Sequence, residues 1–227
     1  MKIKMCMVHF IAATWIGVGA SAASAALHSY SGSAVIATSS LPADVAVGDV
    51  FHFSFTYDDQ ITDTDIDTDN GIFMGATTSF SLASEPGNSG SWNPSGGAFT
   101  FPQRVDTTDD INESGDIIDS IFVDAEGTGF PTLDGEAFDS VSLYLATTAL
   151  GFVNDTGAGQ TLGAQLGGPL PADLSFYDYA LKFQIDTEVG IATGTITALS
   201  VIREPASLAL LGLGGLVVLR RGRRVTN

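Results

Sequence analysis

The stretch Val50–Tyr57 restricts most strongly the secondary structure that this chain can form. It reads Val-Phe-His-Phe-Ser-Phe-Thr-Tyr, so large aromatic side chains occupy every second position. In an extended strand successive side chains point to opposite faces, which puts the four aromatic rings on one face and the other side chains on the opposite face. A helix would scatter these rings around its circumference. The stretch therefore predicts a β-strand with one buried face.

Similar short runs follow one another along most of the chain. Gly-rich or Asp-rich turns separate most of them, and no helix-period segment persists past two turns before Pro205. This pattern predicts an all-β fold, an antiparallel β-sandwich that is jelly-roll-like. The segment Thr147–Asp173 is expected to be a long surface loop. The expected strands are Ser29–Thr38, Asp49–Tyr57, Gly71–Leu82, Gly97–Arg104, Ile117–Asp124, Phe138–Ala146, Leu174–Ile185 and Ile191–Ile202.

Residues 1–25 have the features of a secretory signal peptide. A basic start precedes an apolar stretch and then an Ala-rich segment. The order of these three parts predicts a signal helix that is cleaved after Ala25, with cleavage after Ala22 as the alternative. An uncleaved N-terminal anchor is the other interpretation. The single cysteine, Cys6, lies in this segment, so the exported part is expected to have no disulfide.

The C-terminal segment, residues 203–224, ends the chain with a second apolar stretch. The run Pro205–Leu219 has fifteen residues and no charge. As a helix it would be about 22 Å long, whereas the hydrocarbon core of a bilayer is about 30 Å thick. The arginines behind it should stay on the cytoplasmic side. The pattern predicts an apolar helix that stops in the membrane and can be removed later, with a permanent anchor as the alternative. The flanking residues are Arg203, Glu204 and Pro205 before the run, and Arg220, Arg221, Arg223 and Arg224 behind it.

This tail resembles the PEP-CTERM sorting signal of bacteria, also described as the ice-binding protein C-terminal motif. The match consists of Glu204-Pro205-Ala206-Ser207, the Leu- and Gly-rich run and the terminal arginines, while Arg203 stands where a first proline is usual. The resemblance covers about the last tenth of the chain. It implies export by the Sec translocase across the bacterial inner membrane and recognition by an exosortase. It also implies a location in the membrane, at the cell surface or outside the cell.

A second, weaker resemblance concerns the central region. The blocks Gly48-Asp49-Val50-Phe51 and Phe55-Thr56-Tyr57-Asp58 are similar to a block in domains that often precede this sorting tail. The family has no established chemistry that this match would carry over.

The segment between the two ends, residues 26–202, is a single acidic domain. Its 25 acidic residues outweigh its two cations, Arg104 and Lys182, which gives a net charge of about −23. Such a charge repels nucleic acid and anionic lipid. It favours solubility and the binding of divalent cations. The segment is long enough for one domain with a sizeable core.

The densest acidic group lies between the second and third expected strands. Asp63, Asp65, Asp67 and Asp69 occupy every second position, which in an extended chain places them on one face about 6.6 Å apart. Carboxylates are ligands for Ca²⁺. The EF-hand pattern fails, however, because Asn70 and Ala76 stand where it needs Gly and Glu. A solvated acidic loop and a Ca²⁺ site completed by Asp109, Asp110 or Glu113 are both compatible with the sequence.

Other constellations favour structural interpretations over catalysis. The group from Asp106 to Asp119 is expected to be a solvated turn, although a glycosidase needs only two suitably spaced carboxyls. His52 should face solvent or pack, and His28 should be mobile. No Gly-x-Ser-x-Gly motif occurs. The aromatic residues that can form either core or a sugar-stacking platform are Trp92, Phe99, Phe101, Tyr144, Phe152 and Tyr177, with Trp92 expected to be exposed.

These observations predict a non-enzymatic protein of the extracellular polysaccharide matrix, exported and sorted through its tail. Membrane association through the apolar helix is either transient or permanent. The alternative is a polysaccharide-binding or calcium-binding module on the same sandwich. An exported glycoside hydrolase is the weakest interpretation, and neither a nucleic-acid partner nor a cofactor other than Ca²⁺ is expected.

Overall fold

A computed structural model of the chain describes the acidic domain but neither of its flanking segments. The described residues are 27–65, 70–94, 103–113, 116–126, 132, 133, 135, 138–154 and 159–203. The predicted signal helix, its cleavage site at Ala25 and the predicted apolar helix beyond Arg203 lie outside these ranges. Within them, no helix combines the length and the hydropathy needed to span a membrane.

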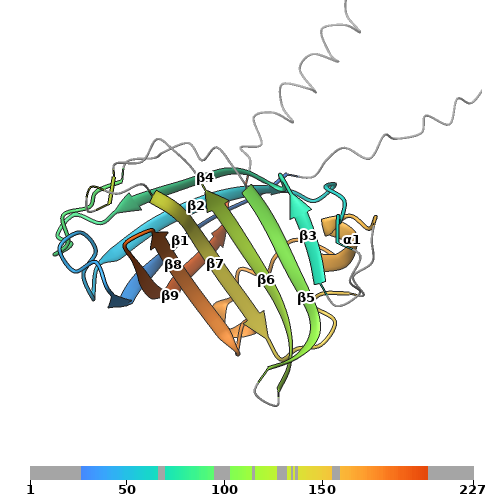
Figure 1. Cartoon of the computed structure of the whole chain (residues 1–227). Coiled ribbons are helices and arrows are strands. Elements are labelled where there is room, and N and C mark those ends of the chain that lie inside the picture. Colours follow the sequence, from blue (N-terminus) through green and yellow to red (C-terminus); the bar gives the residue numbers. More distant parts are fainter. Residues whose placement is uncertain are drawn as a thin grey trace, which may run out of the picture.

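The fold is all-β and antiparallel, as the alternating sequence pattern predicts. The named strands form one nine-stranded sheet with the order β3-β5-β6-β7-β8-β9-β1-β2-β4 (Figure 1). Strands β5 to β9 are a meander in which each strand pairs with the next, and β9 then pairs with β1. The strands are β1 (Leu27–Ser39), β2 (Val50–Asp58), β3 (Asn70–Met74), β4 (Thr77–Ser84), β5 (Gln103–Glu113), β6 (Asp116–Glu126), β7 (Phe138–Thr147), β8 (Ala180–Thr187) and β9 (Gly190–Val201).

The sheet curls into a half-barrel whose two arms face each other, which accounts for the sandwich-like layers. β4, at one edge, contacts β5 and β6 of the opposite arm. Strand twist accumulates across a wide sheet and makes it curl. The order of the strands differs from that of a jelly roll, whose eight strands form two Greek keys. A meander joined to the β1–β2 hairpin takes its place.

The expected strand Gly71–Leu82 is in fact two strands at opposite edges of the sheet. Gly75 has φ of 79°, a conformation that glycine adopts readily and most other residues avoid. The chain turns there, so that β3 pairs with β5 while β4 pairs with β2. The free edge of β3 is covered by its own preceding loop, because the N–H of Thr64 donates to the carbonyl of Ile72.

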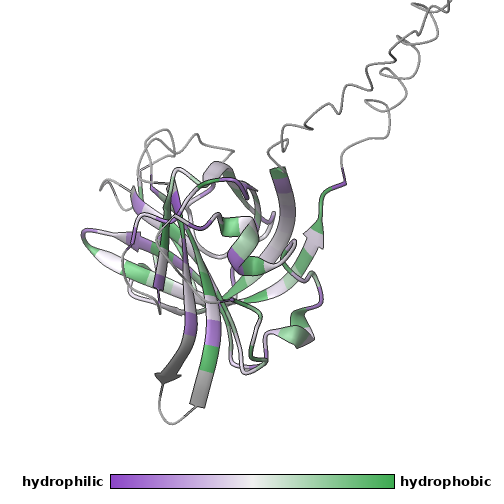
Figure 2. Cartoon of the chain, turned by 90° about the vertical axis from the view of Figure 1, so that its right-hand side faces the viewer, coloured by the Kyte–Doolittle hydropathy of each residue, from purple (hydrophilic) through white to green (hydrophobic). Residues whose placement is uncertain are grey.

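The core lies inside the curl and is built largely from the aromatic face of β2. Phe51, Phe53, Phe55 and Tyr57 are buried, while His52 on the opposite face is exposed. The ring of Tyr30 from β1 stacks on Phe55 with centroids 5.2 Å apart. Hydrophobic and hydrophilic residues alternate along the strands (Figure 2). The expected division of Val50–Tyr57 into two faces is therefore confirmed.

The segment expected as a surface loop, Thr147–Asp173, instead contributes to the core. It contains the short helix α1 (Leu162–Leu166), which has Thr161 as its N-cap, and it is followed by the 3₁₀ turn η1 (Leu174–Phe176). The expected strand Leu174–Ile185 accordingly begins only at Ala180. The apolar side chains of this segment are buried because they cover one end of the core. Those buried are Phe152, Val153, Leu162, Leu166 and Leu170.

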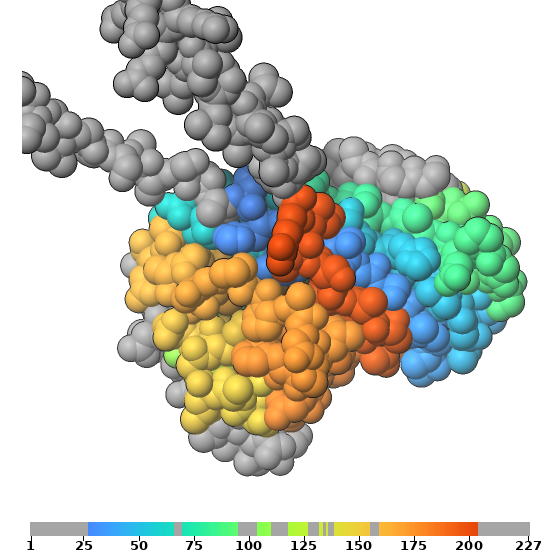
Figure 3. Space-filling model, turned by 180° about the vertical axis from the view of Figure 1, so that it is seen from behind, coloured from blue at the N-terminus to red at the C-terminus, as the bar shows by residue number. Residues whose placement is uncertain are grey.

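The two ends of the described chain meet at one end of the sheet. β1 begins and β9 ends in the same antiparallel pair, with Tyr30 opposite Val201. The N–H of Ile202 donates to the carbonyl of Ser29 at 2.7 Å. Seen from behind, the red end of β9 lies beside the blue start of β1 (Figure 3).

Candidate functional site

The predicted calcium loop is anchored to the fold by its first aspartate. Asp63 is buried, and its Oδ1 accepts hydrogen bonds from the backbone N–H groups of Asp65 at 2.8 Å and Ile72 at 2.9 Å. Its Oδ2 accepts from Nε2 of Gln165 in α1 at 2.9 Å. Asp63 thus joins the loop to β3 and α1. Asp65 is half-buried, and Asp67 and Asp69 lie outside the described residues.

A charged cluster on the outer face of β5 and β6, which we call the Arg104 cluster, contains Arg104, Asp106 and Asp124. Arg104 and Asp106 are two positions apart in β5 and share a face, and Asp124 is the cross-strand partner of Arg104. Nε of Arg104 lies 3.1 Å from Oδ2 of Asp106 and 3.9 Å from Oδ2 of Asp124. The guanidinium of Arg104 therefore forms ion pairs with two carboxylates.

Burial makes both carboxylates of this cluster hard to ionise. The side chain of Asp124 is only 7% exposed, and burial raises its pKa to about 6 even though Arg104 acts to lower it. Glu126 and Asp106 raise it further. Burial also raises the pKa of Asp106, and the nearby charges of Asp65 and Asp63 add to this. Oδ1 of Asp106 and Oδ1 of Asp124 are buried without a hydrogen-bond partner. The cluster can hold a proton close to neutral pH.

The second acidic group, from Asp106 to Asp119, does not form the expected solvated turn. Most of it belongs to β5 and β6, which continue to Glu113 and from Asp116. Asp119 is fully buried, and its Oδ2 accepts hydrogen bonds from the N–H groups of Phe152 at 2.8 Å and Val153 at 3.1 Å. Asp119 is thus a structural residue that fixes the segment covering the core.

The two histidines of the domain have different surroundings. His28, expected to be mobile, is held in β1: its Nε2 lies 3.0 Å from Oδ2 of Asp59, and its ring lies against Tyr57 with centroids 5.1 Å apart. The expectation was wrong because β1 begins at Leu27, directly after the predicted cleavage site. His52 is exposed, as expected, with Nε2 3.8 Å from Oε2 of Glu85.

The aromatic residues do not form an exposed stacking platform among the described residues. Trp92, expected at the surface, is 4% exposed and packs on Phe51. Phe152 and Tyr177 are also buried. Tyr144 lies half-buried on the outer face, with Nζ of Lys182 5.4 Å from its ring centre. Phe99 and Phe101 lie outside the described residues.

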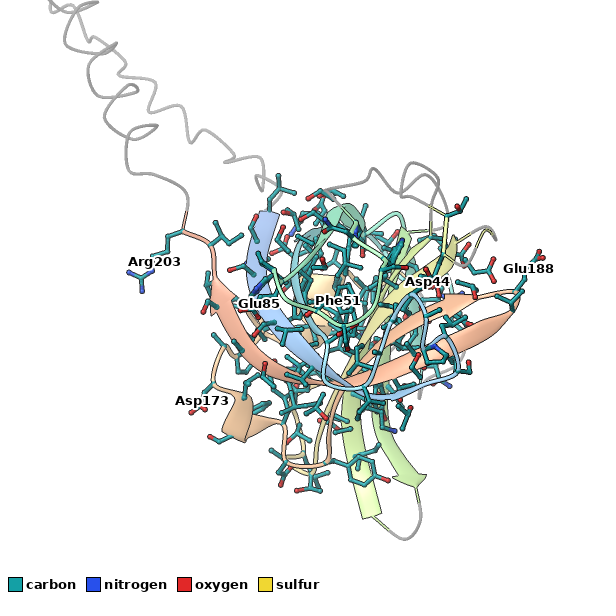
Figure 4. All side chains as sticks on the ribbon, turned by 90° about the vertical axis from the view of Figure 1, so that its left-hand side faces the viewer. Asp44, Phe51, Glu85, Asp173, Glu188 and Arg203 are labelled. Carbon is teal, nitrogen blue, oxygen red and sulfur yellow. The ribbon has the colours of Figure 1, made fainter. Side chains whose placement is uncertain are left out.

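Two grooves are lined by the loop that follows β4. One, of about 380 Å³, is lined by residues 47–50 and 85–89, and the other, of about 250 Å³, by residues 84–88, 90, 92 and 93. The buried carboxylate of Asp49 holds this loop by accepting from the N–H groups of Ser89 at 2.7 Å and Gly90 at 3.0 Å. Figure 4 labels Glu85 and Asp44 in this region and Phe51 in the core behind it. Neither groove is lined by the Arg104 cluster.

Among the described residues, no group of three or more His, Cys, Asp and Glu side chains is placed to hold a metal ion. Arg203, the first residue of the predicted sorting motif, is exposed just after β9, whereas the remaining motif residues from Glu204 to Arg224 lie outside the described ranges. The residues that sequence reasoning missed are Asp49, Asp119 and Gln165, whose importance comes from contacts between distant segments. In the sequence, Arg104 was noted only as one of two cations, Asp106 only as a member of the second acidic group, and Asp124 only as the end of an expected strand.

The fold is the level at which the protein can be classified. The chain matches no family model, and the searches of curated proteins and of solved structures found no match. It is an all-β protein with one curled antiparallel sheet.

Proposed function

We propose that the protein is an exported, non-enzymatic component of the extracellular polysaccharide matrix, sorted through its C-terminal tail. The observation that carries this proposal is the meeting of the two chain ends at one end of the sheet. Ile202 is hydrogen-bonded to Ser29, and the exposed Arg203 follows immediately. Both predicted delivery segments therefore attach to the domain at one place.

This arrangement suits a domain that is carried by its terminal segments. The Sec translocase would handle the segment that ends at Ala25, and the exosortase would read the motif that begins at Arg203. The β8–β9 turn lies on the opposite side of the domain from Arg203 (Figure 4, Glu188 and Arg203). The domain stays attached through the apolar run until that run is removed, or permanently if it is not.

The chemistry of the buried carboxylates supports a structural rather than a catalytic role. Asp49, Asp63 and Asp119 accept hydrogen bonds from protein N–H groups that join distant segments. A nucleophile or a proton donor needs an oxygen that can reach a substrate. The Arg104 cluster lies on the outer face of the sheet and lines neither of the two described grooves.

Mass spectrometry of the protein recovered from intact cells tests the proposal directly. We expect a mature N-terminus after Ala25 and, if the exosortase processes the chain, a C-terminus near Glu204. Replacing Arg220, Arg221, Arg223 and Arg224 by Ala should leave the N-terminus unchanged but abolish C-terminal processing. A cytosolic protein with both Met1 and Asn227 present would overturn the proposal.

Calcium binding by the acidic loop is the second candidate function, because Asp63 fixes one end of a loop that contains three further aspartates. Chelator should then lower the melting temperature of the protein. Substituting Asp65, Asp67 and Asp69 together by Asn should remove this dependence on the chelator and keep the Asp63 contacts. An identical melting temperature with and without chelator would contradict this candidate.

A further inference from the structure

Acidic residues are concentrated in two strands of the sheet and nearly absent from four others. β5 and β6 together contain eight acidic residues. In contrast, the four strands β9, β1, β2 and β4, which are adjacent to one another in the sheet, contain a single acidic residue, Asp58 at the end of β2. They contain neither Lys nor Arg. In a domain whose acids outnumber its cations by about 23, this segregation leaves one broad face of low charge, on which the titratable side chains are Asp58 and His52 of β2, the latter 3.8 Å from Glu85.

The outward-facing residues of β9, β1, β2 and β4, which we call the hydroxyl face, are mostly serine and threonine. The strand register aligns them in rows that run across the sheet. One row consists of Ser200, Ser31, Ser54 and Ser81, all in register. Neighbouring strands lie about 4.8 Å apart and successive outward residues about 6.6 Å apart, so the hydroxyls form a regular two-dimensional array.

The hydroxyls of this face are held in place by one another. Oγ of Ser54 lies 2.6 Å from Oγ of Ser81, and Oγ of Ser33 lies 3.0 Å from Oγ1 of Thr197. Each hydroxyl has one donor and two acceptor positions, so such pairs keep hydrogen-bonding capacity toward a partner. Short side chains that are already ordered lose little conformational entropy on binding.

The face is accessible to a partner. Thr195, Thr197 and Ser200 are exposed, and Ser31 and Ser33 are half-buried. The blue surface of β1 lies between those of β9 in red-orange and β2 in cyan (Figure 3).

Charge and composition decide which partner fits. The acidic residues elsewhere in the domain repel anionic polymers. A second copy is disfavoured, because a stable homodimer needs about 800 Å² per partner with an apolar centre. The larger apolar side chains of this face are Leu27, Val35, Val50 and Ile191, with Leu27 and Ile191 at its two ends. A neutral polymer with many hydroxyls matches both the low charge of this face and its array of donors and acceptors.

We propose that the hydroxyl face binds a neutral polysaccharide along the length of β9, β1, β2 and β4. This inference rests on the proposed function, because it assigns the surface through which the exported domain holds its matrix. With no exposed aromatic platform among the described residues, each sugar contributes little, and affinity comes from many contacts along an extended chain. The face therefore retains an insoluble polymer but not short oligosaccharides.

Co-sedimentation of the mature protein with particles of an insoluble neutral glucan tests this. We expect the wild type to be retained on these particles but not on anionic alginate beads, and soluble oligosaccharides should not compete. The double substitution Thr197→Glu with Ser200→Glu should weaken retention at least about tenfold, because a carboxylate pressed against a neutral polymer loses hydration without gaining a partner. The same added charge outside this face, through Thr132→Glu with Ala149→Glu at exposed positions before and after β7, should leave retention unchanged.

Thermal melts should confirm that both double variants are folded, and Ser79→Glu on β4 provides a second test position if one is not. Failure of the wild type to bind the glucan, or equal retention of all variants, would overturn the inference. So would a wild-type dimer that Thr197→Glu with Ser200→Glu separates, which would identify a second copy as the occupant. Correct mature termini combined with no glucan binding would remove this inference alone, whereas unprocessed termini would remove the proposed function.

Discussion

At the scale of single residues, Asp124 is the group whose protonation should be visible in the stability of the whole domain. Its side chain is almost fully buried beside Arg104, and Oδ1 has no hydrogen-bond partner. Its pKa rises from an ordinary value of 3.8 to about 6 on folding. The folded state therefore binds the proton more tightly than the unfolded state does, and Asp124 stabilises the fold most below its unfolded pKa.

We predict that the contribution of Asp124 to stability is lost as the pH rises through about 6. Linkage gives a loss of about 1.4 kcal/mol between pH 5 and pH 8, and about 3 kcal/mol in full. Asp124→Asn should remove this part of the pH dependence and make the variant more stable than the wild type at pH 8. Urea unfolding at several pH values measures it, with Asp186→Asn in β8 as the control. Parallel curves for the wild type and Asp124→Asn would contradict the prediction.

Asp63 is predicted to act through its hydrogen bonds even in the absence of calcium. Asp63→Ala leaves the N–H of Ile72 and the amide of Gln165 without their acceptor, so the free energy of unfolding should fall by about 2 to 4 kcal/mol. Asp139→Ala, at an exposed position of β7, should change it by less than about 0.5 kcal/mol. Denaturant titration in the presence of chelator separates this effect from metal binding. An equal, small effect of both substitutions would show that the Asp63 hydrogen bonds are dispensable.

At the scale of elements, the strands with strict alternation could be predicted and the segments without it could not. Val50–Tyr57 was predicted as a strand with the correct buried face, since the period of its aromatic residues is a local property. Gly75 marks a turn, but nothing local shows that the strands on its two sides go to opposite edges. The Arg104 cluster depends on the register of β5 against β6, which single-strand patterns do not determine.

The segment containing α1 has a helical spacing of leucines that the prediction of a surface loop did not take into account. Leu162, Leu166 and Leu170 are spaced four apart, which is helical spacing, and all three are buried. The surrounding glycines and prolines favoured a loop, and a five-residue helix is too short for periodicity to outweigh them. The burial arises because the end of the half-barrel needs a cover, a requirement that belongs to the tertiary structure.

The cover formed by α1 should contribute substantially to stability. Leu162 is fully buried, so Leu162→Ala removes apolar contacts and leaves a cavity, which should cost about 2 to 4 kcal/mol. Leu150→Ala is the matched control, because Leu150 is 62% exposed in the same segment. Its effect should stay below about 0.5 kcal/mol. Thermal or denaturant unfolding of both variants measures the difference, and similar values would mean that α1 is a peripheral element.

At the scale of the whole molecule, β9 is the element that joins the meander to the β1–β2 hairpin. It lies between β8 and β1 in the sheet, although it is the last of the named strands along the chain. A chain that ends at Glu188 lacks β9 and should show no cooperative unfolding transition. A chain that ends at Arg203 keeps all nine strands and should unfold cooperatively. Circular dichroism melts and limited proteolysis compare the two, and a cooperative transition in the shorter chain would contradict the role given to β9.

If the chain is exported N-terminus first, as proposed, β1 crosses the membrane long before β9, its partner in the sheet. During this time β1 would lack β9, one of its two neighbouring strands, until residues 190–201 have also crossed. Under the proposed export, the sheet would close only after Val201 has crossed, when the predicted sorting tail enters the translocase. Folding of the domain would thus oppose backward movement of the chain through the translocase at this last step of export.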